Sequence, residues 1–229
     1  MAAIDLSHTP VRQLNAMLHA LAPDTNETLW KVRSPAGKHA IAVGLDAPIT
    51  VEIDGHVGYY CAGMNKQAQI VVRGNAGVGV AENMMSGSVR VEGDASQSAG
   101  ATGRGGLLVI EGNASARCGI SMKGIDIVVK GSIGPMSAFM AQAGNLVVLG
   151  DAGDSLGDSI YEARLFVRGT VKSLGADCVA KPLEPADRII LKDVLARAGL
   201  SDTVRPDEFS LFGSARRLYH FHIDNVGEY

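Results

Sequence analysis

Apolar and polar positions alternate along the middle of the chain, and the alternation returns every nineteen residues. In each period two aliphatic residues stand two positions apart, and the second of them is always β-branched. These pairs are Val51/Ile53, Ile70/Val72, Val89/Val91, Leu108/Ile110, Ile127/Val129, Leu146/Val148 and Leu165/Val167. Residues two apart point to one face of a strand, and β-branched side chains favour a half-buried sheet. Each period therefore predicts one short strand.

A glycine follows each of these strands without a single slip in the spacing. The seven glycines are Gly55, Gly74, Gly93, Gly112, Gly131, Gly150 and Gly169. A polar residue comes directly after each one, as in Gly74-Asn75 and Gly93-Asp94. Such pairs are typical of turns, so we expect every glycine to lie at a corner that needs a positive φ or a tight bend.

Two further positions repeat after each corner. The residue two after the glycine is apolar, and the residue seven after it is always Ala or Gly. A strand, a corner and a second short strand that ends at a small residue describe one coil of a parallel β-helix. The predicted fold class is all-β: a right-handed parallel β-helix of about seven 19-residue coils over residues 48–179, roughly 30–35 Å long.

The segments outside the repeat are expected to cover the two ends of the solenoid, which would otherwise aggregate. Residues 1–47 form the predicted N-terminal α/β cap, with a helix over 9–21 and strands at Leu29–Val32 and His39–Leu45. Residues 180–229 form the predicted C-terminal part, with a helix from Pro185 to Ala198 and then an extended tail. Gly199 is the expected stop of that helix.

The tail carries five of the eleven aromatic residues of the chain. They are Phe209, Phe212, Tyr219, Phe221 and Tyr229. Buried aromatic side chains often anchor protein interfaces. We therefore expect the tail to dock, either in pockets of a partner or around the end of the solenoid.

Composition and charge narrow the function classes. Hydrophobic residues make up 46% and charged residues 20%, which is typical of a globular protein, and the net charge of −3 argues against nucleic acid as a partner. No basic stretch followed by an apolar run opens the chain, and no segment approaches the ~20 apolar residues of a membrane span. A cytoplasmic protein without a membrane partner is expected.

Four groups of residues are candidates for chemistry, and for each a structural role is favoured. Asp158 and Asp177 share a column in neighbouring coils, where a carboxyl pair could serve as an acid, but two solvated loop carboxylates are the favoured interpretation. His220 and His222 could be half of a metal site but lack a third ligand.

The other two groups are glycines and cysteines. The run Gly150–Gly157 could suggest a phosphate loop, but no helix pattern or Lys-Ser/Thr pair follows. Cys61, Cys118 and Cys178 are far apart in the sequence. Cys61 and Cys118 share a column that holds Val or Leu in other coils, which indicates core thiols rather than nucleophiles. We therefore expect no catalytic, cofactor-binding or metal-binding residue on this chain.

Three classes of function remain open on the residues alone: a structural subunit of a larger enzyme, a carbohydrate-active β-helical enzyme, and a solenoid acyltransferase. An acyltransferase solenoid usually has a six-residue period with eighteen residues per coil, which this chain lacks. A polysaccharide enzyme would need clustered acids and exposed aromatic residues on one face, together with secretion.

The repeat also resembles a known family. Gly131–Gly134, Gly150–Gly157 and the loop Gly100–Gly106 are similar to the GXGXG-type β-helical domain that closes the large subunit of glutamate synthase. The segments 82–87, 157–163 and 213–219 look like the B subunit of N-methylglutamate synthase (methylamine–glutamate N-methyltransferase). The β-helical chain of formylmethanofuran dehydrogenase and formyltransferase–hydrolase complexes is a weaker resemblance.

The resemblance implies a structural subunit of a hetero-oligomeric enzyme. Its partners would be an amidotransferase-like subunit and a glutamate-synthase-like subunit that carries FMN and, in some cases, iron–sulfur clusters. The complex would convert methylamine and L-glutamate to N-methyl-L-glutamate and ammonia. Ala2 agrees with a catalytic centre on another chain, because removal of Met1 cannot expose an N-terminal cysteine nucleophile.

Overall fold

The computed structural model describes residues 2–216. Its elements are β1 (Ala2–Asp5), α1 (Val11–His19), β2 (Leu29–Arg33), β3 (Thr50–Asp54), β4 (Gln69–Val72), β5 (Ser88–Val91), β6 (Leu107–Ile110), β7 (Lys123–Val129), β8 (Ala143–Val148), β9 (Arg164–Val167), β10 (Cys178–Lys181), α2 (Pro185–Arg197), the 3-10 turn η1 (Pro206–Glu208) and β11 (Ser210–Ser214).

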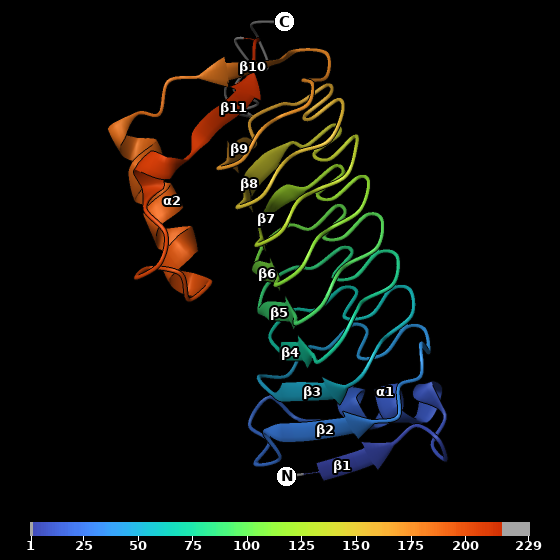
Figure 1. Cartoon of the computed structure of the whole chain (residues 1–229). Coiled ribbons are helices and arrows are strands. Elements are labelled where there is room, and N and C mark those ends of the chain that lie inside the picture. Colours follow the sequence, from blue (N-terminus) through green and yellow to red (C-terminus); the bar gives the residue numbers. More distant parts are fainter. Residues whose placement is uncertain (1, 217–229) are drawn as a thin grey trace, which may run out of the picture.

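The described strands lie in a single sheet that runs the length of the molecule. Its strand order is β1-β2-β3-β4-β5-β6-β7-β8-β9-β11-β10, and neighbours from β1 to β9 are parallel. From β3 onward the register joins equivalent positions of successive coils, such as Val51 to Ile70 and Val72 to Val91. Figure 1 shows the resulting stack of coils. The predicted parallel β-solenoid of about seven 19-residue turns is confirmed.

The sheet extends further toward the N-terminus than the repeat indicated. β2 pairs with β3 through Trp30 and Val51, and β1 adds another parallel strand beyond it. The strand predicted at His39–Leu45 is wrong, because this segment forms turns. Its alternating positive φ at Ala40, Ala42 and Gly44 matches Tyr60, Ala62 and Met64 of the next coil. Residues 39–45 are therefore an irregular side of a first coil.

An irregular run of turns, like residues 39–45 of the first coil, also replaces most of the expected second strand in the later coils. We call this run the arc of each coil. The apolar position two after each corner glycine makes a ladder bridge, for example Val57 to Ala76 and Ala76 to Ala95, and the last coils add one bridge from Leu156 to Leu174. The chain then enters the arc, where alternate residues have positive φ (60°, 58° and 55° at Tyr60, Ala62 and Met64). The arc bonds in both directions, because the Ala81 N–H donates to the Cys61 carbonyl of the coil before and the Asn83 N–H to the Ala101 carbonyl of the coil after, each at 2.9 Å.

The corner glycines are required for close stacking rather than for a positive φ. Of the seven, only Gly55 has a positive φ. A Cβ at Gly131 would lie 2.7 Å from the carbonyl oxygen of Gly112, and the other stacked corners are similarly tight. Of the two expected reasons, a positive φ or a tight bend, six of the seven corners show only the bend, and glycine is needed there because the neighbouring coil leaves no room for a Cβ.

The polar residue after each corner glycine builds a second ladder. Its side chain accepts a hydrogen bond from the backbone N–H of the equivalent residue in the next coil, as in Asp94 N–H to Asn75 Oδ1 (3.0 Å) and Asn113 N–H to Asp94 Oδ1 (2.7 Å). The series runs without a gap over His56, Asn75, Asp94, Asn113, Ser132, Asp151 and Thr170. These side chains accept hydrogen bonds from the backbone N–H groups of the corners and so link successive coils. The sequence had predicted only that they favour a turn.

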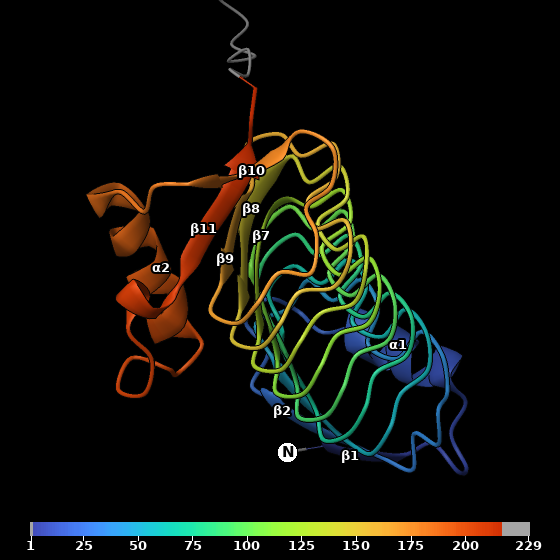
Figure 2. The same cartoon turned by 45° about the horizontal axis from the view of Figure 1, so that its top comes forward.

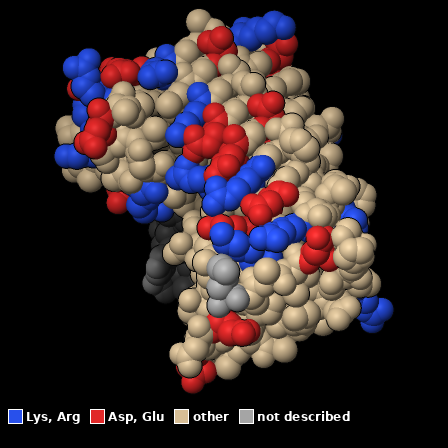
Figure 3. All heavy atoms as spheres, turned by 60° about the horizontal axis from the view of Figure 1, so that its bottom comes forward, with Lys and Arg blue, Asp and Glu red and all other residues tan. Residues whose placement is uncertain are grey.

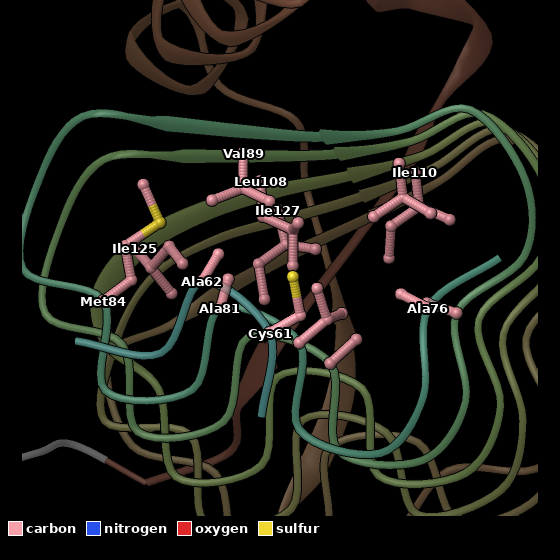
Figure 4. Close-up of a cluster of buried hydrophobic side chains, with 14 of the residues drawn as sticks. Cys61, Ala62, Ala76, Ala81, Met84, Val89, Leu108, Ile110, Ile125 and Ile127 are labelled. Atoms are coloured by element: carbon pink, nitrogen blue, oxygen red, sulfur yellow. The ribbon is translucent and has the colours of Figure 1, made fainter. Parts of the chain in front are cut away.

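The interior of the coils is a continuous hydrophobic core. The two inward strand positions are at most 1% exposed in every period from Val51/Ile53 to Leu165/Val167. Opposite them lies the column of small residues, with Ala62 and Ala81 stacked beneath the sheet in Figure 4. Six of its seven members are buried and face bulky aliphatic side chains, so a small residue keeps the two sides of these coils at their packing distance, whereas Ala176 in the last coil is exposed.

Helix α1 covers the N-terminal end of the core, as predicted. Leu14 and Leu18 of the helix pack into the core. The side chain of Asn15 both donates and accepts a hydrogen bond with the backbone of the first coil. Its Nδ2 donates to the Ala40 carbonyl at 2.8 Å, and its Oδ1 accepts from the Ala42 N–H at 2.9 Å. The helix therefore satisfies backbone groups that a further coil would otherwise bind.

The C-terminal part closes the other end and also returns along the side. Strand β11 inserts between β9 and β10 and runs antiparallel to both. Helix α2, expected as an end cap, instead lies on the outer face of the sheet beside β6–β9 (Figure 2). Within residues 2–216 neither helix has the length and apolar composition needed to cross a bilayer.

Candidate functional site

Ion pairs between side chains of opposite charge lie along the outer face of the sheet, from Glu52 on β3 to Lys130 just after β7. Arg73 contacts Glu52 (3.3 Å) and Glu92 (3.0 Å), and Glu111 pairs with both Arg90 and Lys130. Figure 3 shows positive and negative side chains interleaved in this band. Exposed pairs of this kind contribute little free energy individually, and their charges cancel locally. The band is therefore a solvated surface rather than a site for a charged ligand.

The two aspartates of the candidate acid pair have separate structural partners. Asp158 accepts hydrogen bonds from the Ser159 hydroxyl (2.8 Å) and from the Ala176 N–H (3.2 Å). Asp177 forms an ion pair with Arg216, and its carbonyl accepts from the Ala215 N–H at 2.7 Å. Neither carboxylate lines the cavity described below. The geometry assigns both residues to holding the last coils and β11 together.

The glycine run 150–157 uses its backbone donors within the solenoid. The N–H groups of Gly150, Gly153 and Gly157 donate to carbonyls of the preceding coil at 2.9–3.0 Å, and the Ala152 N–H donates to the following coil at 2.8 Å. A phosphate loop needs several free N–H groups that converge on the anion. These donors are already occupied, so the run does not fit a nucleotide or the phosphate of FMN.

The three cysteines are buried free thiols. Burial raises the pKa of Cys61 and of Cys118 to about 12 and that of Cys178 to about 11. Figure 4 shows Cys61 among aliphatic side chains of the core. The thiolate is the nucleophilic form of cysteine, and an environment that disfavours it does not suit catalysis.

We expect the native protein to react with a thiol reagent such as Ellman's reagent at pH 8 far more slowly than the unfolded chain. The physical reason is that Cys61 and Cys118 have no exposed surface and a raised pKa. Titration in buffer and in guanidinium chloride measures this, with the unfolded chain releasing all three equivalents. Fast stoichiometric labelling of the native protein would contradict the assignment to the core.

Several predicted site residues lie beyond the described part of the chain. His220, His222, Tyr219, Phe221 and Tyr229 fall in residues 217–229, outside the described residues. Within residues 2–216 no group of three His, Cys, Asp or Glu side chains comes together as a metal site.

The other two aromatic residues of the tail, Phe209 and Phe212, lie among the described residues and contact other parts of the same chain. Phe209 is 6% exposed and packs in the cluster formed by α2 and the outer face of the sheet. Phe212, on β11, is half-buried against the solenoid core. Phe209 therefore packs against its own chain on the outer face of the sheet rather than around the end of the solenoid, whereas Phe212 retains some exposed surface.

An open cavity of about 850 Å³ lies where the last coils meet the C-terminal strands. It is bounded by the start of β8, the chain entering β9, strand β11 and the N-terminus of α2. Charged residues of both signs line it: Arg164, Lys181 and Arg216 with Glu162, Glu184 and Asp187. Tyr161, which is 46% exposed, and Phe212 add aromatic surface.

The polar groups of this cavity are largely engaged with one another. Arg164 Nε donates to Asp187 Oδ1 at 3.0 Å, while Asp187 Oδ2 accepts from the Glu184 N–H at 3.2 Å as part of the helix cap. Ser214, the hydroxyl on its wall, is buried and accepts from the Arg216 N–H at 3.2 Å. Among the described residues no histidine or cysteine lines the cavity beside that hydroxyl.

The sequence carried an unused signal for the position of α2. The outward position of each strand, three before the corner glycine, is polar or charged in some coils but apolar in four successive ones: Val109, Val128, Val147 and Phe166. In the structure these four residues are at most 2% exposed, beneath Leu191, Val194 and Leu195 of α2. An apolar run on an outward column indicates a covering element.

A comparison with curated proteins finds a full-length relative. The chain is 62% identical over 229 residues to "Protein GlxC" of Rhizobium meliloti (strain 1021), and the match covers all of both chains. No protein-family model matches the chain. No solved structure matches it either.

Proposed function

This chain belongs to the family of Protein GlxC, and from that premise we propose that it is a non-catalytic structural subunit of a glutamate-synthase-like enzyme complex. The proposed complex is N-methylglutamate synthase, which converts methylamine and L-glutamate to N-methyl-L-glutamate and ammonia. In this proposal the chain braces a subunit that carries FMN and an amidotransferase-like subunit.

The observation that carries the proposal is the self-contained bonding of the coils. Backbone donors of the arcs and corners bond the coil above or below, as at Gly150, Gly153 and Gly157, and the corner side chains form a ladder of their own. Such a prism deforms little, because each coil is tied to both neighbours. A rigid body of this kind suits the fixing of two catalytic partners at a set separation.

The same bonding explains why the chemistry would belong to the partners. The candidate carboxylates and the glycine run make structural contacts, and the thiols are buried in the core. FMN, when bound to its own subunit, supplies redox chemistry in the complex. This chain contributes surfaces, among which the cavity beside Tyr161 and Phe212 offers aromatic and charged groups to a neighbour.

Reconstitution tests the proposal. The chain is co-expressed with the FMN-containing and amidotransferase-like chains of the same organism, and assembly is followed by size-exclusion chromatography. We expect one complex that forms N-methyl-L-glutamate from methylamine and L-glutamate, measured by mass spectrometry. Omission of this chain should abolish or strongly reduce product, while the purified chain alone should form none.

Substitutions at the aspartates separate scaffolding from hidden catalysis. Asp158→Asn and Asp177→Asn should leave turnover of the assembled complex within a few-fold of wild type, because both residues make structural contacts. Loss of a general acid would instead lower the rate by ~100-fold or more. Turnover by the isolated chain, or a loss of that size in either variant, would contradict the scaffold role.

A further inference from the structure

One exposed column follows the corner at which each arc turns back toward the sheet. Its members stand eleven positions after the corner glycine: Lys66, Met85, Arg104, Lys123, Gln142 and Tyr161, here called the corner stripe. All six side chains are exposed. Each residue donates its backbone N–H to a carbonyl of the preceding coil at 2.7–2.8 Å. The stripe is therefore a straight column with one side chain per coil, at a spacing of ~4.8 Å.

Two of the three cations in the stripe lack the acidic partner that most cations elsewhere on the coils have; the third, Lys66, pairs with Asp46 at 2.8 Å. In residues 48–179 the other cations have acidic partners, for example Arg73 with Glu92, whereas Arg104, Arg117 and Lys123 form no ion pair with any residue in 2–216. Arg104 and Lys123 are neighbours in the stripe, one coil apart. Like charges on adjacent strands repel, so this arrangement is unfavourable in the free chain.

Exposed methionines lie in and beside the stripe. Met85 belongs to it, and Met64 and Met140 occupy the column two positions earlier in the arc; the three side chains are 39–46% exposed. Methionine is flexible and polarizable, and it is used at surfaces that adapt to a partner. Its neighbour Met84 points inward to the core, as Figure 4 shows, so the exposure of Met85 comes from the alternation at this corner.

We propose that the corner stripe is the face on which a partner subunit of the complex docks, and that the partner presents acidic residues around an apolar patch. This inference rests on the proposed function and names the surface and its chemistry. Carboxylates of the partner would neutralise Arg104 and Lys123, while its apolar patch would cover Met85. Desolvation would strengthen these ion pairs relative to the surface pairs of the sheet face.

A protein partner fits these groups better than nucleic acid does. Proteins that bind duplex DNA commonly contact about 6–10 phosphates, and each contact needs a cationic or polar donor. The stripe offers two uncompensated cations and a methionine, on a chain whose net charge is −3. An acidic protein surface with an apolar patch therefore matches both the two cations and the methionine of the stripe.

The test compares two double variants with the same change in net charge. Arg104→Glu/Lys123→Glu reverses the stripe. Arg12→Glu/Lys192→Glu, the control, reverses exposed cations on the outer sides of α1 and α2 that also form no ion pair within residues 2–216. Each variant is co-expressed with the two partner chains, and its affinity for the purified partners is measured by biolayer interferometry. Thermal melts of the free chains verify folding.

We expect the stripe variant to bind about 100-fold more weakly or not at all, and the control to stay within about threefold of wild type. Wild-type binding should also weaken as NaCl rises from about 0.1 to about 0.5 M. A wild-type complex that the stripe variant joins with equal affinity overturns the inference and leaves the proposed function standing. Failure of the wild type to bind either partner overturns both. Binding to a random-sequence DNA duplex that only the stripe variant loses also overturns it.

Discussion

Replacement of Gly119 by leucine is expected to prevent folding or to cause aggregation. Gly119 has a φ of +68°, and a Cβ there would lie 3.1 Å from Met122 Sδ and 3.4 Å from Ile127 Cδ1. A left-handed non-glycine residue costs about 1–2 kcal/mol, and extra methylenes in a packed core cost about 1–3 kcal/mol more. Together these are a large part of the ~5–15 kcal/mol that holds a typical domain folded.

Gly119→Ala is the matched control for this substitution. Ala62, Ala81 and Ala138 occupy the same column with φ of 56–58°, so the backbone accepts alanine there. We expect a loss of only about 1 kcal/mol in the free energy of unfolding. Urea denaturation followed by circular dichroism compares the two variants, with the soluble fraction measured by size-exclusion chromatography. A leucine variant that unfolds at the wild-type midpoint would show that the small column does not limit packing.

Gly131→Ala is expected to destabilise the protein more than Gly37→Ala, although Gly131 has no positive φ. A Cβ at Gly131 would lie 2.4 Å from Asn113 Oδ1 and 2.7 Å from the Gly112 carbonyl oxygen. The coils would have to separate there, and the Ser132 N–H to Asn113 Oδ1 bond of the corner ladder would weaken. We expect a loss of about 2–3 kcal/mol, the usual size for overpacking.

Gly37 isolates the contribution of backbone conformation alone. Its φ is +70°, and a Cβ there would meet no atom within 4 Å. Gly37→Ala should therefore cost only the left-handed conformation, about 1–2 kcal/mol. Denaturant midpoints of both variants, measured together, give the order. If Gly37→Ala proved the more damaging, positive φ rather than close stacking would be the reason for glycine in this protein.

The glycine columns show how far repetition alone can be interpreted. A column of Ala and Gly in seven periods indicates limited space, and the structure confirms buried residues facing the sheet at Ala62, Ala81 and Gly119. The repeated glycines also identified the corners, but they did not show why a corner needs glycine. Whether glycine serves a positive φ or a close contact depends on the distance to the next coil, which no single period contains.

The candidate site depended still more on long-range contacts. The pairing of Asp177 with Arg216 joins residues 39 positions apart, and the cavity beside Tyr161 forms only because β11 inserts between β9 and β10. The His39–Leu45 prediction failed for a similar reason. An apolar run can be a strand or an arc, and here the alternating positive φ of Ala40 and Ala42 is supported by hydrogen bonds to α1 and to the next coil.

The sequence by itself determined the solenoid, its nineteen-residue period, the inward strand positions and the presence of both helices. These features follow from local periodicity, because a residue's place in its coil sets the face to which it points. Only the tertiary structure decided where α2 lies, what the corner residues bond and which cations remain uncompensated. Those features depend on which segments meet across many residues, as Val147 and Phe166 meet α2, and the order of residues within one period does not specify such meetings.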